Sequence, residues 1–346
     1  MKKNKFYENL TKTYVIAEIG VNHNNNLEIA KKLIKEAKFS GADAVKFQTF
    51  SAEKLVIPGT RKVKYQKKNL NDKESHYEMI KYLELSKKHH KILFNYCKKI
   101  KIEFISTPYD VDSAKFLTKL GVNIFKTASA DLIDYELHKY ISQTNKPVII
   151  STGMSTIKEI AATIKIYKNN KKNISLLHCV SNYPCSYDSL NIKSLKLLTE
   201  TFNCPIGYSD HSKDNTAACL AIALGSKIIE KHFTLDKGMK GPDHKASCTP
   251  KELKSLVMDI RKTELILGKK EKKKQKEEDE MSSISRKSLY YIKNLKKNSI
   301  INKNSIFALR PGNGISPMNL PKILGKKINK EVKINDKFKF NQLKKS

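Results

Sequence analysis

The feature that most constrains this sequence is a regular alternation between short apolar runs and longer amphipathic segments over the first 235 residues. Each run is rich in β-branched residues and is followed by a helical pattern, which is typical of parallel strands buried on both faces. Eight such runs are present, at residues 14–20, 44–49, 103–108, 124–129, 147–152, 175–180, 205–211 and 227–233. Eight strand–helix units in about 250 residues predict an α/β fold of the (β/α)8 TIM barrel type.

The placement of polar residues supports a barrel. In this fold the chemistry is carried at the carboxyl ends of the strands, so unusual polar residues should fall late in the runs or directly after them. A doubly wound open sheet is the alternative, but it would not distribute such residues over every strand. The residues that meet this expectation are Glu18, Lys46, Gln48, Thr107, Lys126, Ser129, Ser151, Ser181, Ser209, His211 and His232.

A charged segment follows the last predicted helix of the barrel. Residues 269–280 read KKEKKKQKEEDE and have no apolar face, so we interpret them as a solvated linker or a frayed helix. The sequence thus predicts a barrel over residues 1–268, a linker over 269–283 and a small β-rich domain over 284–346. This last part is too short to bury a strong core unaided, and we expect it to dock on another surface.

Composition narrows the class of protein. With 346 residues and 39% hydrophobic residues, the chain can bury a sizeable core. No signal-peptide pattern precedes the first strand, and no run of about 18 apolar residues predicts a membrane span. The six cysteines are scattered without metal-type spacing, which favours free thiols and a cytoplasmic protein.

The net charge of +33 raises the question of nucleic-acid binding. The lysines are spread over the whole length, and no recognised binding motif accompanies them. We interpret the charge as a compositional bias toward lysine at exposed positions. The positive potential that results favours a small anionic substrate. A basic nucleic-acid binder is kept as a remote alternative.

Two histidines suggest a metal site. His211 and His232 lie at the ends of the seventh and eighth predicted strands, which are neighbours in a barrel. Two imidazoles on neighbouring strand ends can share one divalent ion, with water and substrate oxygens in the other positions. The alternative is that each is a core histidine without a ligand. A polar loop, GPDHKAS, follows the eighth strand and contains Asp243.

The chain resembles the sialic acid (N-acetylneuraminate) synthase family from residue 14 to about residue 336. The matching segments are AEIGVNHNNN, GADAVKFQTF, LELS, FISTPYD, STGMS, LHC, NYP, IGYSDHS, EKHFTLD, GPDHKAS and RPGNGISP. The tail resembles the antifreeze-like (SAF) domain that ends these enzymes. The resemblance implies condensation of phosphoenolpyruvate with an N-acetylhexosamine, with release of phosphate by C–O cleavage.

The resemblance also implies roles for individual residues. His211 and His232 would hold a divalent metal, Mn²⁺ in the first place and Mg²⁺ or Co²⁺ otherwise, and Glu18 would act near the metal as a catalytic residue with Lys46, His232 and Asp243. In family members the tail caps the partner's barrel, which implies a domain-swapped homodimer. The implied phosphoenolpyruvate-binding residues are Lys46, Thr107, Lys126, Ser129, Ser151, Ser181, Tyr183 and Ser209; the implied sugar-binding residues are Gln48, Asp131, Tyr183, Asp243 and Arg310.

Two departures from the family pattern concern individual contacts. Ser181 stands where a phosphoenolpyruvate-binding asparagine is expected, and Asp131 replaces a longer glutamate. For the sugar, N-acetylmannosamine giving N-acetylneuraminate is favoured by YQK at residue 65, LELS and GPDHKAS. A diacetamido-trideoxyhexose giving legionaminate or pseudaminate is the alternative. A Schiff-base aldolase that uses Lys46 or Lys126 is a remoter one.

Overall fold

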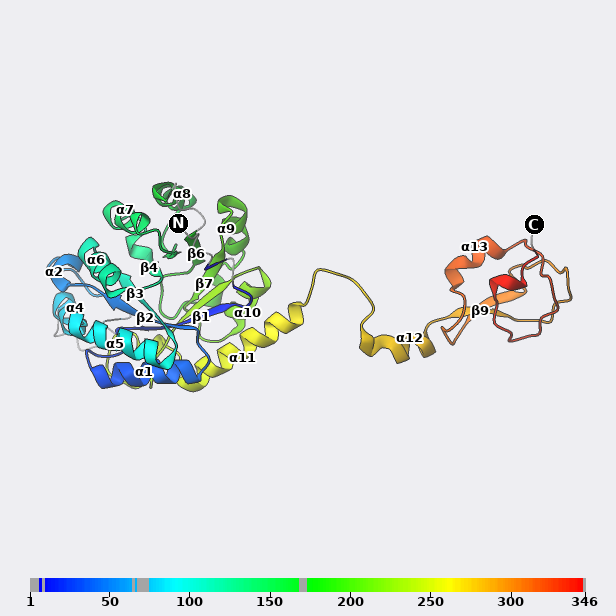
Figure 1. Ribbon diagram of the computed structural model, residues 1–346, viewed down its shortest axis with the longest axis horizontal. Coiled ribbons are helices and arrows are strands. Elements are labelled where there is room, and N and C mark those ends of the chain that lie inside the picture. The colour runs from blue at the N-terminus through cyan, green and yellow to red at the C-terminus, as the bar shows by residue number, and fades with distance from the viewer. Residues whose placement is uncertain (1–5, 8–9, 64–65, 67–74, 168–172, 345–346) are drawn as a thin grey trace. The chain divides into compact units, whose positions relative to one another are not determined.

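The computed structural model describes residues 6–7, 10–63, 66, 75–167 and 173–344 (Figure 1). The chain forms two compact units, Met1–Gly268 and Lys269–Ser346. Among the described residues, no helix is both long and apolar enough to cross a membrane.

The first unit is built around eight parallel strands. Their hydrogen-bonded order is β3-β2-β1-β8-β7-β6-β5-β4, and β3 and β4 at the two ends of this order pack against each other. The sheet is therefore a nearly closed barrel, and the predicted (β/α)8 TIM barrel is confirmed. The strands are β1 (Tyr14–Gly20), β2 (Ala44–Thr49), β3 (Glu103–Pro108), β4 (Phe125–Thr127), β5 (Val148–Ser151), β6 (Ile174–His178), β7 (Ile206–Asp210) and β8 (Ile228–His232).

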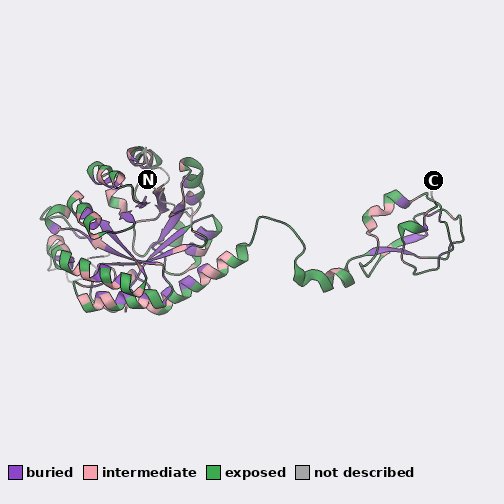
Figure 2. Ribbon diagram, in the orientation of Figure 1, coloured by how far each residue is buried: buried purple, intermediate pink, exposed green. Residues whose placement is uncertain are grey.

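Burial explains why these strands are almost continuously apolar. Every residue of β4, β5 and β7 is buried, because helices cover the outside of the barrel and side chains fill its inside. Figure 2 shows the strands buried at the centre and the helices exposed on their outer sides. The main core lies between the strands and these helices.

Several helices begin at N-cap residues whose side chains accept backbone hydrogen bonds. Asn26 accepts hydrogen bonds from the backbone of Glu28 and Ile29, and Thr249 forms a capping box with Glu252 ahead of Pro250. The helices of this unit are α1 (Leu27–Phe39), α2 (Ala52–Leu55), α4 (His76–Leu83), α5 (Lys87–Ile100), α6 (Val111–Leu120), α7 (Tyr135–Gln143), α8 (Ile157–Ile166), α9 (Ser194–Phe202), α10 (Thr216–Ala223) and α11 (Pro250–Leu267).

The connection after β2 is the long loop that the sequence predicts. It contains the single helical turn α2 and ends at Ser75, whose side chain caps α4. Residues 64–65 and 67–74 of this loop lie outside the described residues. Among its described residues, Leu55, Val56 and Thr60 line a cavity at the carboxyl ends of the strands.

The second unit has a small core of its own. Strands β9 (Ser288–Tyr291) and β10 (Ile306–Leu309) are antiparallel, and short bridges join the segments that follow. Helix α12 (Asp279–Ser285) begins within the segment predicted as a linker, and α13 (Leu320–Ile323) lies in the tail. The core residues include Leu289, Tyr291, Ile306, Ile323, Ile328 and Phe338.

Gly207 in β7 provides a test of the barrel packing. A Cβ at this position would meet Leu177 Cδ2 and lie 2.6 Å from the backbone oxygen of Ile228. We expect Gly207→Ala to destabilise the barrel by about 1–3 kcal/mol, the usual cost of overpacking. Urea denaturation followed by circular dichroism measures this. The control is Gly238→Ala, where the nearest atom to a Cβ is 3.3 Å away; equal losses of stability would contradict the packing argument.

Candidate active site

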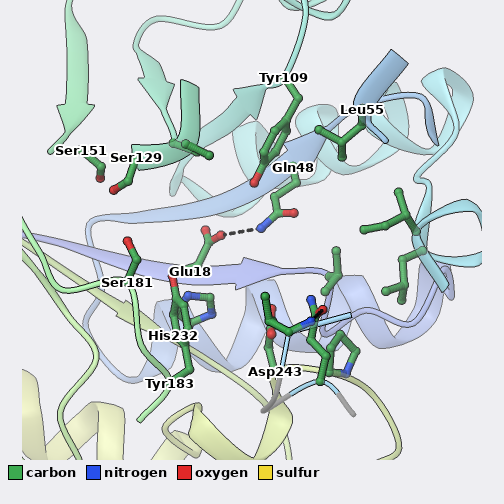
Figure 3. Close-up of a pocket in the computed structure, with 18 of the residues that line it drawn as sticks. Glu18, Gln48, Leu55, Tyr109, Ser129, Ser151, Ser181, Tyr183, His232 and Asp243 are labelled. Carbon is green, nitrogen blue, oxygen red and sulfur yellow. Dashed lines mark hydrogen bonds between the residues drawn. The ribbon is translucent and has the colours of Figure 1, made fainter. Parts of the chain in front are cut away.

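A cavity of about 500 Å³ opens at the carboxyl ends of the barrel strands. Parallel strands end at the same rim, so polar residues far apart in the sequence meet there (Figure 3). It is lined by most of the residues predicted from the sequence: Glu18, Lys46, Gln48, Lys126, Ser129, Ser151, Ser181, Tyr183, Ser209, His211, His232 and Asp243.

Four buried charges occupy the base of this cavity. Lys46 Nζ lies 2.9 Å from Glu18 Oε2 and 3.7 Å from Glu230 Oε1. Lys126 Nζ lies 3.9 Å from the same Glu230 oxygen. All four side chains are at most 6% exposed, so these ion pairs are poorly screened by solvent. Two ammonium groups are thereby held side by side with two carboxylates.

Burial and neighbouring charges shift the pKa values of this cluster in different directions. Burial raises the pKa of Glu18 to about 7, although the Lys46 ammonium opposes this shift. Burial disfavours the Lys46 cation, yet Glu18 and Glu230 outweigh it and raise the pKa of Lys46. The pKa of Glu230 is lowered, because Lys126 and Lys46 outweigh the effect of burial. Glu18 is therefore the carboxyl group that can take up or release a proton near neutral pH.

Hydroxyl groups surround the two lysines. Lys126 Nζ donates to Ser151 Oγ at 2.5 Å, and Lys46 Nζ donates to Thr107 Oγ1 at 3.2 Å. The backbone of Gly153 donates to Ser129 Oγ at 3.0 Å. A Cβ at Gly153 would lie only 2.5 Å from Ser181 Oγ and 2.9 Å from Ser129 Oγ, so these hydroxyls can keep their positions only because residue 153 is glycine. Ammonium groups and hydroxyls at this spacing are suited to phosphate and carboxylate oxygens.

His211 and His232 also line the cavity, with their ring centroids 5.6 Å apart, and Ser209 Oγ lies 3.2 Å from Glu230 Oε1 and 3.5 Å from His211 Nε2. Burial lowers the pKa of both side chains, so both rings are neutral at pH 7. His211 Nδ1 donates to the backbone oxygen of Val180 at 2.6 Å, which leaves Nε2 with its lone pair. His232 Nδ1 is buried, with no hydrogen-bond partner among the described residues.

This histidine pair fits a divalent metal with two protein ligands. A ring nitrogen oriented by a backbone carbonyl is the usual arrangement of a metal-binding histidine. The described residues contain no group of three or more histidine, cysteine or acidic side chains that could hold an ion. Water and substrate oxygens would therefore have to supply the remaining ligands.

The remainder of the cavity is more apolar. Gln48 Nε2 donates to Glu18 Oε1 at 3.3 Å, at the boundary with the buried charges (Figure 3). Asp243 is the acidic residue of this part. The loop after β2 and α4 contribute six apolar lining residues, Leu55, Val56, Val63, Met79, Ile80 and Leu83, together with the polar Thr60, Gln66 and His76.

Three predicted residues do not line the cavity. Thr107 lies behind Lys46, to which it is hydrogen-bonded. Asp131 follows β4, but it is not among the described lining residues; burial and Asp134 raise its pKa to about 7. Arg310 follows β10 in the second unit, where it is exposed. The sugar contacts of Asp131 and Arg310 stay predictions.

The sequence analysis missed Glu230 and the apolar wall. Glu230 lies two residues before His232 on β8, so both side chains point to the same face of the strand. That spacing could have identified it. Met79, Ile80 and Leu83 read as ordinary core positions of α4, and nothing in their spacing distinguishes a cavity wall from a core.

The raised pKa of Glu18 predicts a pH-dependent contribution to stability. Its pKa is about 7 in the folded protein and near 4.5 when exposed, so protonation stabilises the folded state. This contribution is present below about pH 4.5 and is lost as the pH rises through 7. Relative to wild type, Glu18→Gln should therefore gain stability as the pH rises from 5 to 7.5, measured by urea denaturation. Glu200→Gln, at an exposed position on α9, controls for the change in net charge. If the difference in unfolding free energy between Glu18→Gln and wild type stays constant over this pH range, the raised pKa of Glu18 is wrong.

Comparison with known proteins places the chain in a family. The NeuB family model matches residues 33–272. The chain is 43% identical to N,N'-diacetyllegionaminic acid synthase of Campylobacter jejuni, over 94% of this chain and 98% of that protein. It is 42% identical to the enzyme of the same name from Legionella pneumophila, and the match covers 91% of this chain and 90% of that protein.

A solved structure agrees with this relationship. The N-acetylneuraminic acid (sialic acid) synthetase of Leptospira borgpetersenii, in complex with citrate, is 34% identical and has a TM-score of 0.69. The match covers 78% of this chain and 90% of that one. With a family match over most of the barrel and relatives matched over nearly their full length, the chain belongs to the NeuB family.

Proposed function

We propose that this protein condenses phosphoenolpyruvate with the aldehyde of an N-acetylated amino sugar and releases phosphate. The observation that carries the proposal is that one cavity contains two chemically different groups of side chains. Lys46, Lys126 and the hydroxyls around them suit a phosphate and a carboxylate, while the two neutral imidazoles suit a metal beside a carbonyl oxygen. The names of the relatives, which are N,N'-diacetyllegionaminic acid synthases, support the same reaction class.

The proposed reaction forms one C–C bond and breaks one C–O bond. C3 of phosphoenolpyruvate bonds to the sugar aldehyde carbon, whose oxygen takes a proton. Water adds to C2, and the C2–O bond to phosphate then breaks to leave a 2-keto acid and inorganic phosphate. Lys46 and Lys126 hold the anionic groups and stabilise the charge on the departing phosphate. Glu18, with a pKa of about 7, holds the attacking water and accepts its proton.

We propose that His211 and His232 bind Mn²⁺, with Mg²⁺ or Co²⁺ as alternatives. The neutral rings and the backbone-bound Nδ1 of His211 support this assignment. When bound, the ion would supply Lewis-acid polarisation of the aldehyde. Tyr183, with its ring 4.1 Å from that of His211, would hold the imidazole in place from the cavity side.

For the sugar, we propose a diacetamido-trideoxyhexose and a legionaminate product, in place of the N-acetylmannosamine that the sequence favoured. Two legionaminic acid synthases share 42–43% identity with the chain, against 34% for the sialic acid synthetase structure. The apolar wall of Leu55, Val56 and Met79 supports this choice. A methyl and an acetamido group match that wall better than hydroxyls, which lose hydration there. Pseudaminate is the remaining alternative.

The sugar preference can be measured directly. Purified protein is incubated with phosphoenolpyruvate, Mn²⁺ and each sugar: N-acetylmannosamine and the legionaminate and pseudaminate precursors. We expect kcat/KM for the legionaminate precursor to be at least about tenfold higher, because a hydroxyl facing an apolar wall costs about 1–3 kcal/mol. Phosphate release and product mass are the readouts. Higher kcat/KM with N-acetylmannosamine would restore the neuraminate assignment, and no turnover with any sugar would contradict the proposed function.

Metal dependence separates this mechanism from a Schiff-base aldolase. We expect EDTA to abolish turnover, Mn²⁺ to restore it, and His232→Ala to lose activity at every metal concentration, because that variant lacks one of two protein ligands. Borohydride treatment with pyruvate should leave Lys46 and Lys126 unmodified by mass spectrometry. A covalent adduct on either lysine, with activity retained in EDTA, would favour the aldolase.

The last part of the proposal concerns the C-terminal domain, residues 284–346. By resemblance, it would act as an antifreeze-like domain that caps the barrel of a partner in a homodimer, with Arg310 reaching the N-acetyl group. The exposure of Arg310 within its own unit is compatible with that role. We place the protein in the cytoplasm, in keeping with six cysteines that all remain free thiols.

A further inference from the structure

The loop after β8 is hydrogen-bonded to the loop after β1 through residues outside the proposed chemistry. Pro242 and Asp243 of this loop line the cavity, whereas the next residue, His244, is fully buried behind them. His244 Nδ1 lies 2.6 Å from Thr234 Oγ1, and Nε2 lies 3.3 Å from Asn24 Oδ1. One imidazole thus joins the end of β8, its own loop and the loop after β1.

The partners of His244 determine which of its two ring nitrogens carries the proton. Asn24 Nδ2 donates to the backbone oxygen of Lys240 at 2.9 Å, so Asn24 Oδ1 faces His244 and must accept. His244 therefore carries its proton on Nε2. Its Nδ1 accepts from the Thr234 hydroxyl at 2.6 Å, and the same hydroxyl has a longer contact, 3.1 Å, to the backbone oxygen of Asp236. Burial lowers the pKa of His244 to about 4, so this neutral form persists at pH 7.

A second connection reaches the backbone of Asp243 itself. Asn22 Nδ2 donates to Ser247 Oγ at 2.8 Å and to the backbone oxygen of Phe233 at 2.9 Å. Ser247 Oγ in turn donates to the backbone oxygen of Asp243 at 2.7 Å. Asn22 and Ser247 are each at most 2% exposed. The loop that carries Asp243 is therefore held on both sides of that residue.

Gly241 shows how closely the ring is packed. A Cβ at this position would lie 2.6 Å from His244 Cδ2 and 2.8 Å from Nε2. The ring can occupy its place between Asn24 and Thr234 only because residue 241 has no side chain.

We propose that His244 is a positioning residue that holds Asp243 at the sugar end of the cavity by joining the loops after β1 and β8. The inference rests on the proposed function, since it assigns Asp243 to the sugar. His244 is not among the residues that line the cavity, so its effect on the reaction has to pass through the loop.

The test compares the Michaelis constants for the two substrates. We expect His244→Ala to raise KM for the sugar about tenfold and to leave KM for phosphoenolpyruvate within about twofold, because only the sugar side depends on this loop. In an Asp243→Ala background, His244→Ala should have no further effect on the sugar KM, since the two residues act as a unit. His244→Gln, which keeps an N–H donor for Asn24, should partly restore the sugar KM.

His138 provides a matched control. It is also fully buried, on α7, where its ring nitrogens lie 2.8 Å from Tyr167 Oη and 3.1 Å from the Asp131 backbone oxygen. In an Asp131→Ala background, which removes the proposed sugar contact of that residue, adding His138→Ala should lower stability as His244→Ala does but leave both KM values unchanged. If the two variants raise KM for the sugar equally, or if His244→Ala adds its full effect to Asp243→Ala, the positioning role is wrong.

Hydrogen–deuterium exchange tests the same inference without turnover. His244→Ala should increase exchange over residues 236–248, while His138→Ala should not. Gly241→Ala, which displaces the ring, should act like His244→Ala and replaces it if that variant does not fold. Unchanged exchange in this loop overturns the positioning role even if the wild-type protein is inactive with every sugar. Inactivity of the wild-type protein contradicts the proposed function alone.

Discussion

The register between parallel strands is the constraint on which the site depends. Glu18 on β1 is level with Lys46 on β2 and with His232 on β8. Because side chains alternate between the two faces of a strand, residues at the same level on neighbouring strands point into the barrel together. A shift of one residue in any of these pairings would move a charge from the cavity into the apolar layer under the helices. The catalytic geometry and the stability of the barrel therefore depend on the same hydrogen bonds.

The buried charges are balanced in the absence of substrate. Glu18 and Glu230 compensate Lys46 and Lys126, so none of the four is left without an opposite charge in a site of low dielectric. The pKa of Glu18 is about 7, so this carboxyl group is the member of the cluster that titrates near neutral pH. To accept the proton of the attacking water in the proposed reaction, Glu18 has to be ionised at that step, and the Lys46 ammonium 2.9 Å away favours the ionised form.

The two ends of the cavity are built in different ways. The proposed anion site comes mainly from strand residues, whose positions are set by the barrel, with Ser129 and Ser181 added from the segments after β4 and β6. The proposed sugar site comes from the loops after β2 and β8 and from α4, and loops vary more easily without loss of the fold. This arrangement allows one reaction to serve several sugars within a family. It also explains why a network such as Asn24–His244–Thr234 is needed to hold a loop residue in place.

The sequence by itself determined the eight strands, their order along the chain, and most of the polar residues that line the cavity. Strand periodicity is a local property, and the carboxyl end of each strand can be read from where its apolar run stops. The sequence could not identify the Glu230 pairing with both lysines, because β2, β4 and β8 are separated by many residues. It also could not distinguish the apolar wall contributed by α4 and the loop after β2 from an ordinary core. Only the tertiary structure decided these points, since a side chain becomes a cavity wall or a counter-ion through what the folded chain places opposite it.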